Sequence, residues 1–166
     1  MKIKNVIYII VSIILILVTY SITCLYKDCT ILSSGDKYIH LYKGLLSYLI
    51  ENNSEYLDDA EYIAVDANSF KITSELDKKL LIEHLQEYND KIILASYDML
   101  NDKEYIDENG VLSGVFISAS ELEFVFNTVT CEYTMYKGPL ASVGYNTKST
   151  YNYDNWKIKY KAFLIS

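Results

Sequence analysis

The chain has 166 residues, with 22 acidic residues against 15 basic ones and a formal net charge of −7 at pH 7. Every basic residue is lysine, so no guanidinium is present for bidentate capture of carboxylate or phosphate, and the acidic balance argues against nucleic acid as a partner. The cysteines, Cys24, Cys29 and Cys131, are odd in number and irregularly spaced, which excludes a disulfide framework or zinc site but leaves a Cys29–Cys131 bridge open in an oxidising compartment.

The chain begins with an apolar segment. Asn5–Tyr26 carries no charge, and Lys2 and Lys4 precede it. A helix of this length spans about 33 Å, against about 30 Å for the hydrocarbon core of a bilayer. Because lysines stay on the cytoplasmic side of a membrane, we expect a single-pass signal-anchor over residues 1–29. The domain of residues 30–166 would then lie outside the cytoplasm, at the cell membrane.

Two other interpretations of this segment remain open. A cleaved signal peptide usually has an apolar run of about 7–15 residues and a small-x-small cleavage site, whereas this run is longer and no good site follows it. The second alternative is a lipoprotein signal, since Ser21-Ile22-Thr23-Cys24 loosely resembles a lipobox. It departs from that pattern at Ser21 and Thr23, so the anchor is favoured.

The first half of the domain alternates helical and strand patterns. Apolar residues at three- and four-residue steps predict an amphipathic helix over 36–51. Short apolar runs predict buried strands over 62–65 and 92–95, and Ser74 has the spacing of a cap for a helix over 75–89. Strand, helix and strand together have the size and order of one parallel βαβ unit.

From residue 111 onward the hydrophobic period changes to two, which is typical of half-buried strands. Strands are predicted over 111–118, 125–135 and 140–151, with a turn at Gly138-Pro139. In the last predicted strand, 156–164, apolar residues alternate with lysines, which is the clearest β pattern in the chain. We therefore expect one α+β domain with a βαβ-like first half and an antiparallel meander at the C-terminus.

Three motifs carry a resemblance to a known family: Asn109-Gly110-Val111-Leu112-Ser113-Gly114, then Tyr136-Lys137-Gly138-Pro139-Leu140-Ala141-Ser142-Val143-Gly144-Tyr145, then Asn155-Trp156-Lys157-Ile158. With them the chain resembles a small uncharacterised family of membrane-tethered or exported proteins from low-GC Gram-positive bacteria. More distantly, the closing hairpin resembles those of cystatin-like and NTF2-like α+β modules, a likeness of fold alone. The resemblance implies a location and a fold, and it carries no site residues across.

Acidic side chains follow both predicted parallel strands. Asp66 comes directly after the first strand and Asp98 shortly after the second, so both would lie at the carboxyl edge of the sheet, where open α/β sheets bind ligands. Ser74, at the start of the following helix, could add donors for an anion. Asp is also a common turn former, and a purely structural role for these residues is the competing interpretation.

The aromatic residues offer the remaining candidate binding groups. Tyr136 and Tyr145, in the C-terminal strands, could stack on a sugar or grip a peptide, although core and turn positions are the commoner use of tyrosine. Cys131 falls on the apolar face of its strand and is expected to be a buried, unreactive thiol. No catalytic motif, metal site or cofactor site is predicted from the sequence.

Two functions compete. The first is a non-catalytic extracytoplasmic module that binds an envelope protein, a peptide or a wall component; a narrower version is a regulator whose helix 36–51 couples the domain to the membrane segment. The second is a small envelope hydrolase or metal-dependent enzyme that uses Asp66 and Asp98. The chain offers few of the groups that enzymes tune, namely two isolated histidines and no arginine, so the module is favoured.

Overall fold

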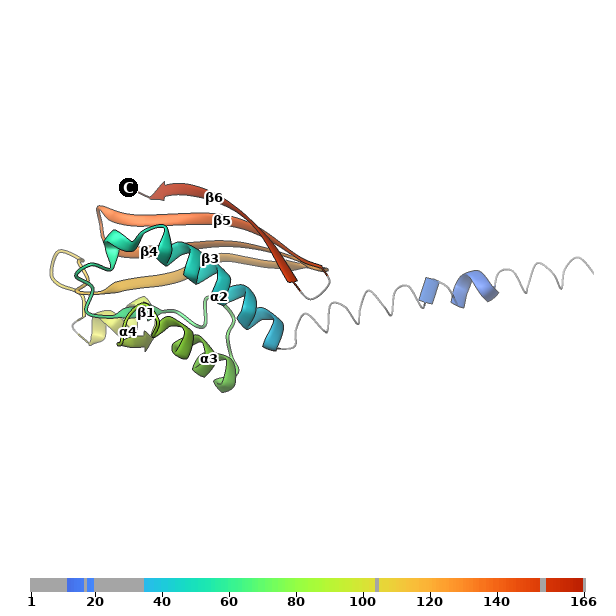
Figure 1. The fold of residues 1–166 in the computed structure, drawn as a ribbon, viewed down its shortest axis with the longest axis horizontal. Helices are drawn as coiled ribbons and strands as arrows, with labels where there is room; N and C mark the ends of the chain where they lie inside the picture. The colour runs from blue at the N-terminus through green and yellow to red at the C-terminus, as the bar shows by residue number, and fades with distance from the viewer. Residues whose placement is uncertain (1–11, 17, 20–34, 104, 153–154, 166) are drawn as a thin grey trace, which may run out of the picture.

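The computed structural model describes residues 12–16, 18–19, 35–103, 105–152 and 155–165 (Figure 1). The helices of the domain are α2 (Gly35–Glu51), α3 (Glu75–Leu85) and α4 (Tyr97–Asp102), with a short 3-10 turn, η1 (Ser54–Tyr56). The strands are β1 (Ile63–Val65), β2 (Ile92–Leu94), β3 (Val115–Val125), β4 (Thr128–Gly138), β5 (Ala141–Asn152) and β6 (Asn155–Ile165).

All six strands belong to one mixed sheet in the order β2-β1-β3-β4-β5-β6. β1 lies parallel to both β2 and β3, while β3 to β6 form an antiparallel meander. The predicted α+β fold, with its βαβ unit and its C-terminal meander, is confirmed. The pairing of β1 with β3 joins the βαβ unit to the meander. The hydrophobic period along the chain could not indicate this pairing.

The main core lies between the sheet and the two longer helices. α2 crosses one face of the meander, and α3 lies beside α2 near β1 (Figure 1). Leu41, Leu45 and Leu49 of α2 are fully buried, at the four-residue spacing that places side chains on one helix face. α2 and α3 are also linked by a polar contact, in which Ser47 Oγ lies 2.7 Å from His84 Nε2.

A second, smaller core lies on the other face of the sheet, at the β1 end. It contains Tyr62, Ala64, Leu100, Leu112 and Phe116, and α4 supplies one of these residues. β1 is therefore buried on both faces, as expected for a strand between parallel neighbours. Further along the meander, no described helix or strand packs on this face, and it carries exposed polar side chains.

The hairpin between β3 and β4 corrects the prediction for this region. The sequence suggested separate strands over 111–118 and 125–135, but β3 continues to Val125 and the chain reverses at Phe126 and Asn127. This turn was missed because it contains neither glycine nor proline, the residues that usually mark a hairpin. α3 also ends at Leu85, four residues before the predicted end.

Several residues expected in one core are found there. Leu85, Val129 and Tyr133 are buried, while Leu80, Trp156, Ile158 and Tyr160 are partly buried and pack against them. Trp156 is less enclosed than predicted because it lies beside the turn of the β5–β6 hairpin, at the end of the sheet, where its ring contacts Tyr38 and Tyr151.

The predicted membrane segment lies mostly outside the described residues. Its described pieces, 12–16 and 18–19, are helical. Within the described part of the chain, no helix combines the length and the hydropathy needed to cross a bilayer. Cys29 also lies outside the described residues, so its predicted bridge to Cys131 is not tested; Cys131 itself is buried and free.

Candidate functional site

The carboxyl ends of β1 and β2 border a small hollow. It measures about 120 Å³ and is lined by Asp66, Ala67, Asn68, Lys78, Leu94, Ala95, Ser96 and Met99. Parallel strands end at the same edge of a sheet, so the residues that follow β1 and β2 meet here. This is the edge at which the sequence suggested a ligand site.

Asp66 is engaged in a turn at this edge. Its Oδ1 accepts hydrogen bonds from the backbone N–H of Asn68 at 3.0 Å and of Ser69 at 3.2 Å, which is the geometry of an Asx turn. Ser69 Oγ donates to the Asp66 carbonyl at 2.7 Å and accepts from the Ala119 N–H at 2.9 Å. The aspartate therefore holds the loop after β1 against β3.

The other predicted members of this site are not in the lining of the hollow. Ser74 caps α3, accepting from the Asp77 N–H at 3.4 Å, and Asp98 is an exposed residue in the first turn of α4. Lys78, which does line the hollow, pairs with Glu75 at 2.7 Å. Among the described residues, no group of three histidine, cysteine or acidic side chains could hold a metal ion.

The two candidate tyrosines lie on opposite faces of the sheet. Tyr145 is 6% exposed, packs on Tyr48 with ring centroids 5.4 Å apart, and accepts a hydrogen bond from Asn53 Nδ2 at 3.2 Å. Tyr136 is half-buried beside Tyr97 and donates its hydroxyl to the Gly110 carbonyl at 2.9 Å. Tyr145 thus serves the core, while Tyr136 lies at one end of the face opposite α2.

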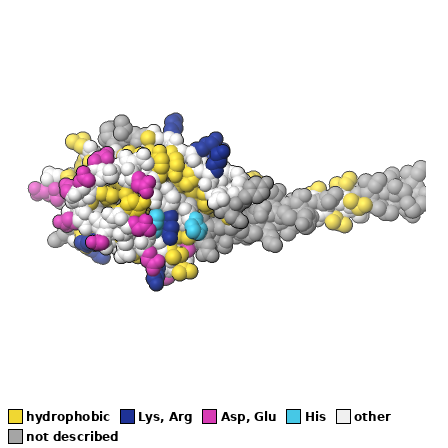
Figure 2. Space-filling model, in the orientation of Figure 1, with side chains coloured by type: hydrophobic (Ala, Val, Ile, Leu, Met, Phe, Trp, Pro, Cys, Tyr) yellow, Lys and Arg dark blue, Asp and Glu magenta, His cyan; other side chains and the backbone are white. Residues whose placement is uncertain are grey.

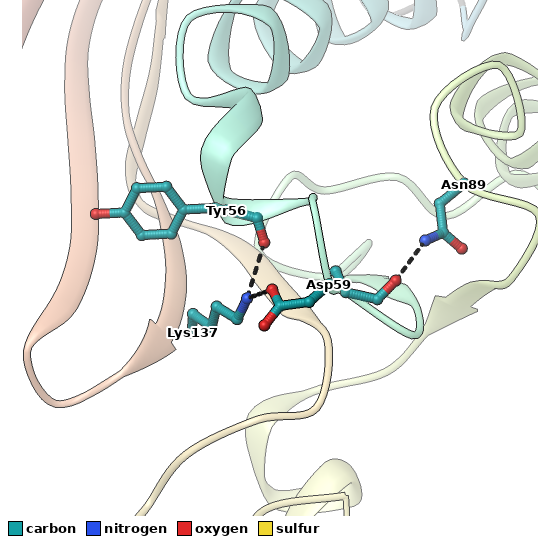
Figure 3. A network of polar contacts seen from close by, with 5 residues as sticks. Tyr56, Asp59, Asn89 and Lys137 are labelled. Atoms are coloured by element: carbon teal, nitrogen blue, oxygen red, sulfur yellow. Dashed lines mark hydrogen bonds and ion pairs between the residues drawn. The ribbon is translucent and has the colours of Figure 1, made fainter.

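Lys137 anchors the loop that precedes β1. Its Nζ donates to the Tyr56 carbonyl at 3.3 Å and to the Asp59 carboxylate (Figure 3), and this hydrogen bond lowers the pKa of Asp59. Asn89 holds the same loop from the other side through the Ala60 carbonyl at 2.9 Å. These contacts fasten residues 56–60 between β4 and the α3–β2 connection, which is a structural role.

The side of β3 to β6 that faces away from α2, which we call the open face, carries polar side chains. Strand register defines rows of side chains across it. One row consists of Glu121, Glu132, Asn146 and Lys161. The next consists of Glu123, Thr130, Lys148 and Lys159. Acidic residues thus lie on β3 and β4, and lysines lie on β5 and β6.

This separation places like charges side by side. Glu121 pairs directly with Glu132, and Lys148 pairs directly with Lys159, an arrangement that destabilises a sheet. None of these four side chains forms an ion pair in the described structure. Figure 2 views the domain from the side of α2 and α3, opposite the open face, and shows acidic groups at the end of the domain away from the start of α2.

The acidic half of the open face also contains a hollow of about 170 Å³, lined by Glu121, Thr130, Cys131, Glu132, Asn146 and Thr147. Glu132 accepts a hydrogen bond from Ser120 Oγ at 3.0 Å at its rim. The β3 strand shifts its register between Ala119 and Glu121, and this bulge opens the surface locally.

Comparison with protein-family models, curated proteins and solved structures returns no match for this chain. The resemblance drawn from its motifs therefore stays a prediction, and function has to be inferred from the geometry of the sheet.

The sequence indicated one half of the open face. The alternation of Lys157, Lys159 and Lys161 along the last strand is visible in the chain, and it places all three on one face. The acidic half could not be anticipated, because the hairpin at Phe126 was not recognised. Without that turn, Glu121 and Glu123 had no predicted neighbour across the sheet.

Proposed function

We propose that this chain is a membrane-anchored, extracytoplasmic binding module without catalytic activity. Its open face would bind an envelope protein whose contact surface carries both signs of charge. The observation that carries this proposal is the separation of Glu121, Glu123 and Glu132 from Lys148, Lys159 and Lys161 across four neighbouring strands.

Separating acidic from basic side chains across the sheet destabilises the domain itself, and its benefit lies in contact with another molecule. Alternating signs on neighbouring strands would stabilise the sheet through cross-strand pairs, whereas equal signs destabilise it. Toward a partner, a face with an acidic and a basic half fixes orientation and rejects surfaces of uniform charge. The pattern therefore favours recognition of a partner over stability of the domain.

The size of the face suits a protein partner. Four strands about 4.8 Å apart and eleven or twelve residues long, at about 3.3 Å per residue, span about 700 Å² before sheet twist reduces the flat area. A standard protein interface buries about 800 Å² on each partner. Exposed ion pairs contribute little individually, so we expect weak, salt-sensitive binding that confinement to one membrane makes effective.

The location is part of the proposal. The uncharged segment Asn5–Tyr26 would cross the membrane with its N-terminus in the cytoplasm, and only residues 27–34 separate it from α2. Eight residues reach about 26 Å when fully extended. A domain on so short a tether meets partners near the outer surface of the bilayer.

The candidate catalytic groups support a non-catalytic role. Asp66 is bound within its own turn. Burial raises the pKa of the Cys131 thiol to about 12, so it is not a nucleophile near neutral pH. His84 is held between two helices by Ser47.

A second candidate function remains, a small envelope hydrolase or metal-dependent enzyme that uses Asp66 and Asp98. The hollow of about 120 Å³ at the carboxyl edge of β1 and β2 favours it, because ligands of open α/β sheets bind there. Turnover of an envelope substrate by the purified full chain, abolished by Asp66→Asn, would support this enzyme and contradict the binding module.

The binding module is tested by crosslinking in intact cells that express the full chain. A zero-length reagent that joins carboxyl and amino groups should yield a specific adduct with an envelope protein. Lys159→Gln/Lys161→Gln should reduce that adduct at least about tenfold, the loss expected for two charge pairs worth 0.7 kcal/mol each. The matched control is Lys79→Gln/Lys103→Gln, which removes two exposed lysines from outside the open face.

The results separate the possible partners. An adduct of twice the chain mass would identify a second copy, which fits because acidic and basic halves can face each other across a two-fold axis parallel to the strands. If the two double variants reduce the adduct equally, the loss reflects the change in net charge, and the open face is not the binding surface. The absence of any adduct that depends on Lys159 and Lys161 would contradict the proposal.

A further inference from the structure

The tip of the β3–β4 hairpin exposes three consecutive apolar side chains. Phe124 is 37% exposed, Val125 is 56% exposed and Phe126 is 59% exposed. The residues from 124 to 131 include no charged group. Consecutive apolar residues at a solvent-exposed turn cost solubility, and such clusters usually mark a contact with another molecule or a membrane.

The backbone of this tip is suited to a different residue. Phe126 has φ of 54°, the left-handed region that is favourable for glycine and asparagine and unfavourable for a bulky side chain. Asparagine is the next residue in the chain, yet phenylalanine occupies the strained position. Strain retained at an exposed position suggests a use for the side chain that folding alone does not supply.

The tip lies at the end of the domain where α2 begins. Tyr38, in the first turn of α2, packs on Phe124 with ring centroids 4.9 Å apart and on Trp156 at 6.3 Å. Figure 1 shows the β3–β4 and β5–β6 hairpin ends on the same side as the start of α2, with the C-terminus at the opposite end. Aromatic rings from three elements, those of Tyr38, Phe124 and Trp156, therefore cluster beside the exposed Val125 and Phe126.

The charge around the tip is compatible with lipid headgroups. Lys71 Nζ lies 5.1 Å from the Phe124 ring centroid and donates to the Leu122 carbonyl at 3.0 Å. Lys157 follows Trp156 on β6 and is exposed. The nearest acidic residue along β3 is Glu123, which lies on the open face. Aromatic rings beside lysines are the usual composition of a membrane-interface contact.

From these observations we infer that Val125 and Phe126 insert into the outer interface of the lipid bilayer, at the end of the domain where α2 begins. This inference rests on the proposed membrane anchor, which brings the tip within about 26 Å of the surface. The insertion fixes the domain with its long strands standing on the membrane. The open face is then held sideways, toward neighbours in the same membrane.

The inference is tested with the full chain reconstituted into vesicles of phosphatidylcholine and phosphatidylglycerol with brominated acyl chains. Trp156→Phe removes the single tryptophan and leaves an aromatic ring beside Tyr38. In that background Phe126→Trp should be quenched at least about twofold relative to unbrominated vesicles, as expected for a side chain about 5–10 Å deep in the interface. Leu140→Trp is the matched control, since Leu140 is 95% exposed at the opposite end of the sheet; it should show no quenching.

A second measurement keeps the native tryptophan. Bromine quenching of Trp156 in the otherwise unchanged chain should fall when Phe126→Asp removes the insertion, but not when Leu140→Asp is made. Retention of the chain in vesicles after an alkaline carbonate wash reports on the anchor separately. A retained chain with no quenching at position 126 would overturn the inference and leave the anchor intact. A chain that washes off would overturn both.

Discussion

At the scale of single residues, Gly114 shows how closely β3 approaches the residue before β1. A Cβ atom at this position would lie 2.4 Å from the Tyr62 carbonyl oxygen and 2.6 Å from its ring. Tyr62 is fully buried, and its carbonyl accepts from the Val115 N–H at 3.0 Å. The Tyr62 backbone therefore cannot move away from this Cβ without breaking the hydrogen bond that pairs β1 with β3.

Gly114→Ala should therefore lower the free energy of unfolding by about 3 kcal/mol or more, the upper range for overpacking. Gly44→Ala is the control, because its Cβ would meet only the flexible end of Ile158 at 3.4 Å and should gain about 0.5–1 kcal/mol in a helix. Urea unfolding followed by circular dichroism measures both. Equal effects of the two substitutions would contradict the close approach.

The buried thiol of Cys131 and several buried tyrosine hydroxyls predict how the free energy of unfolding depends on pH. Burial raises the pKa of Cys131 from 9.0 to about 12 and that of Tyr160 from 10.0 to about 12, and it also raises the pKa values of Tyr42 and Tyr133. The folded state thus keeps a proton that the unfolded chain releases. This contribution is fully present below pH 9 and is lost as the pH rises toward 12.

We expect the free energy of unfolding to fall by about 1.4 kcal/mol per pH unit from Cys131 alone between pH 9 and 12. Urea unfolding at pH 7, 9 and 10.5 measures the slope. Cys131→Ala lowers stability at every pH by opening a small cavity, but it should reduce the loss between pH 9 and 10.5. An unchanged slope in that variant would show that the thiol does not contribute.

At the scale of elements, the hairpins and α2 decide which surfaces are available. α2 covers one face of the meander through its buried leucines, and its first turn meets both hairpin ends through Tyr38. The β3–β4 turn then sets the register that separates acids from lysines on the open face. One short turn thus defines both the apolar tip and the charge pattern.

The strain at this turn can be measured. Phe126→Gly should raise the free energy of unfolding by about 1 kcal/mol, because glycine adopts positive φ without a Cβ clash. Asn127→Gly should lower it by about 0.5–1 kcal/mol, since φ there is not positive and glycine increases the entropy of the unfolded chain. It also removes the hydrogen bond from Asn127 Nδ2 to the Tyr151 carbonyl. A loss of stability in Phe126→Gly would show that the ring supports the fold.

At the scale of the whole molecule, the proposed membrane anchor makes a prediction about where the domain lies. The full chain should keep residues 1–29 and remain in the membrane fraction after an alkaline carbonate wash, even though that pH weakens the folded domain. A C-terminal tag should be digested by protease added outside intact, wall-free cells. Recovery of a shorter soluble product would instead indicate a cleaved signal peptide.

The sequence by itself predicted most of the elements. α2, β1, β2 and β6 lie close to their predicted ranges, because hydrophobic spacing reports which side of a local element is buried. It also predicted that Cys131 is a buried thiol, and it placed Asp66 at the carboxyl edge of β1. Each of these follows from the residue type and its immediate neighbours in the chain.

The tertiary structure alone decided how these elements combine. Phe126 gave no turn signal, so the β3–β4 hairpin appears only when the strands pair and bury Val129 and Cys131 under α2. Tyr145 is a core residue. Asp66 lines a small hollow, and Asp98 is not part of its lining. The charge pattern of the open face depends on register between strands, which arises from contacts between residues distant in the chain and is therefore absent from local sequence patterns.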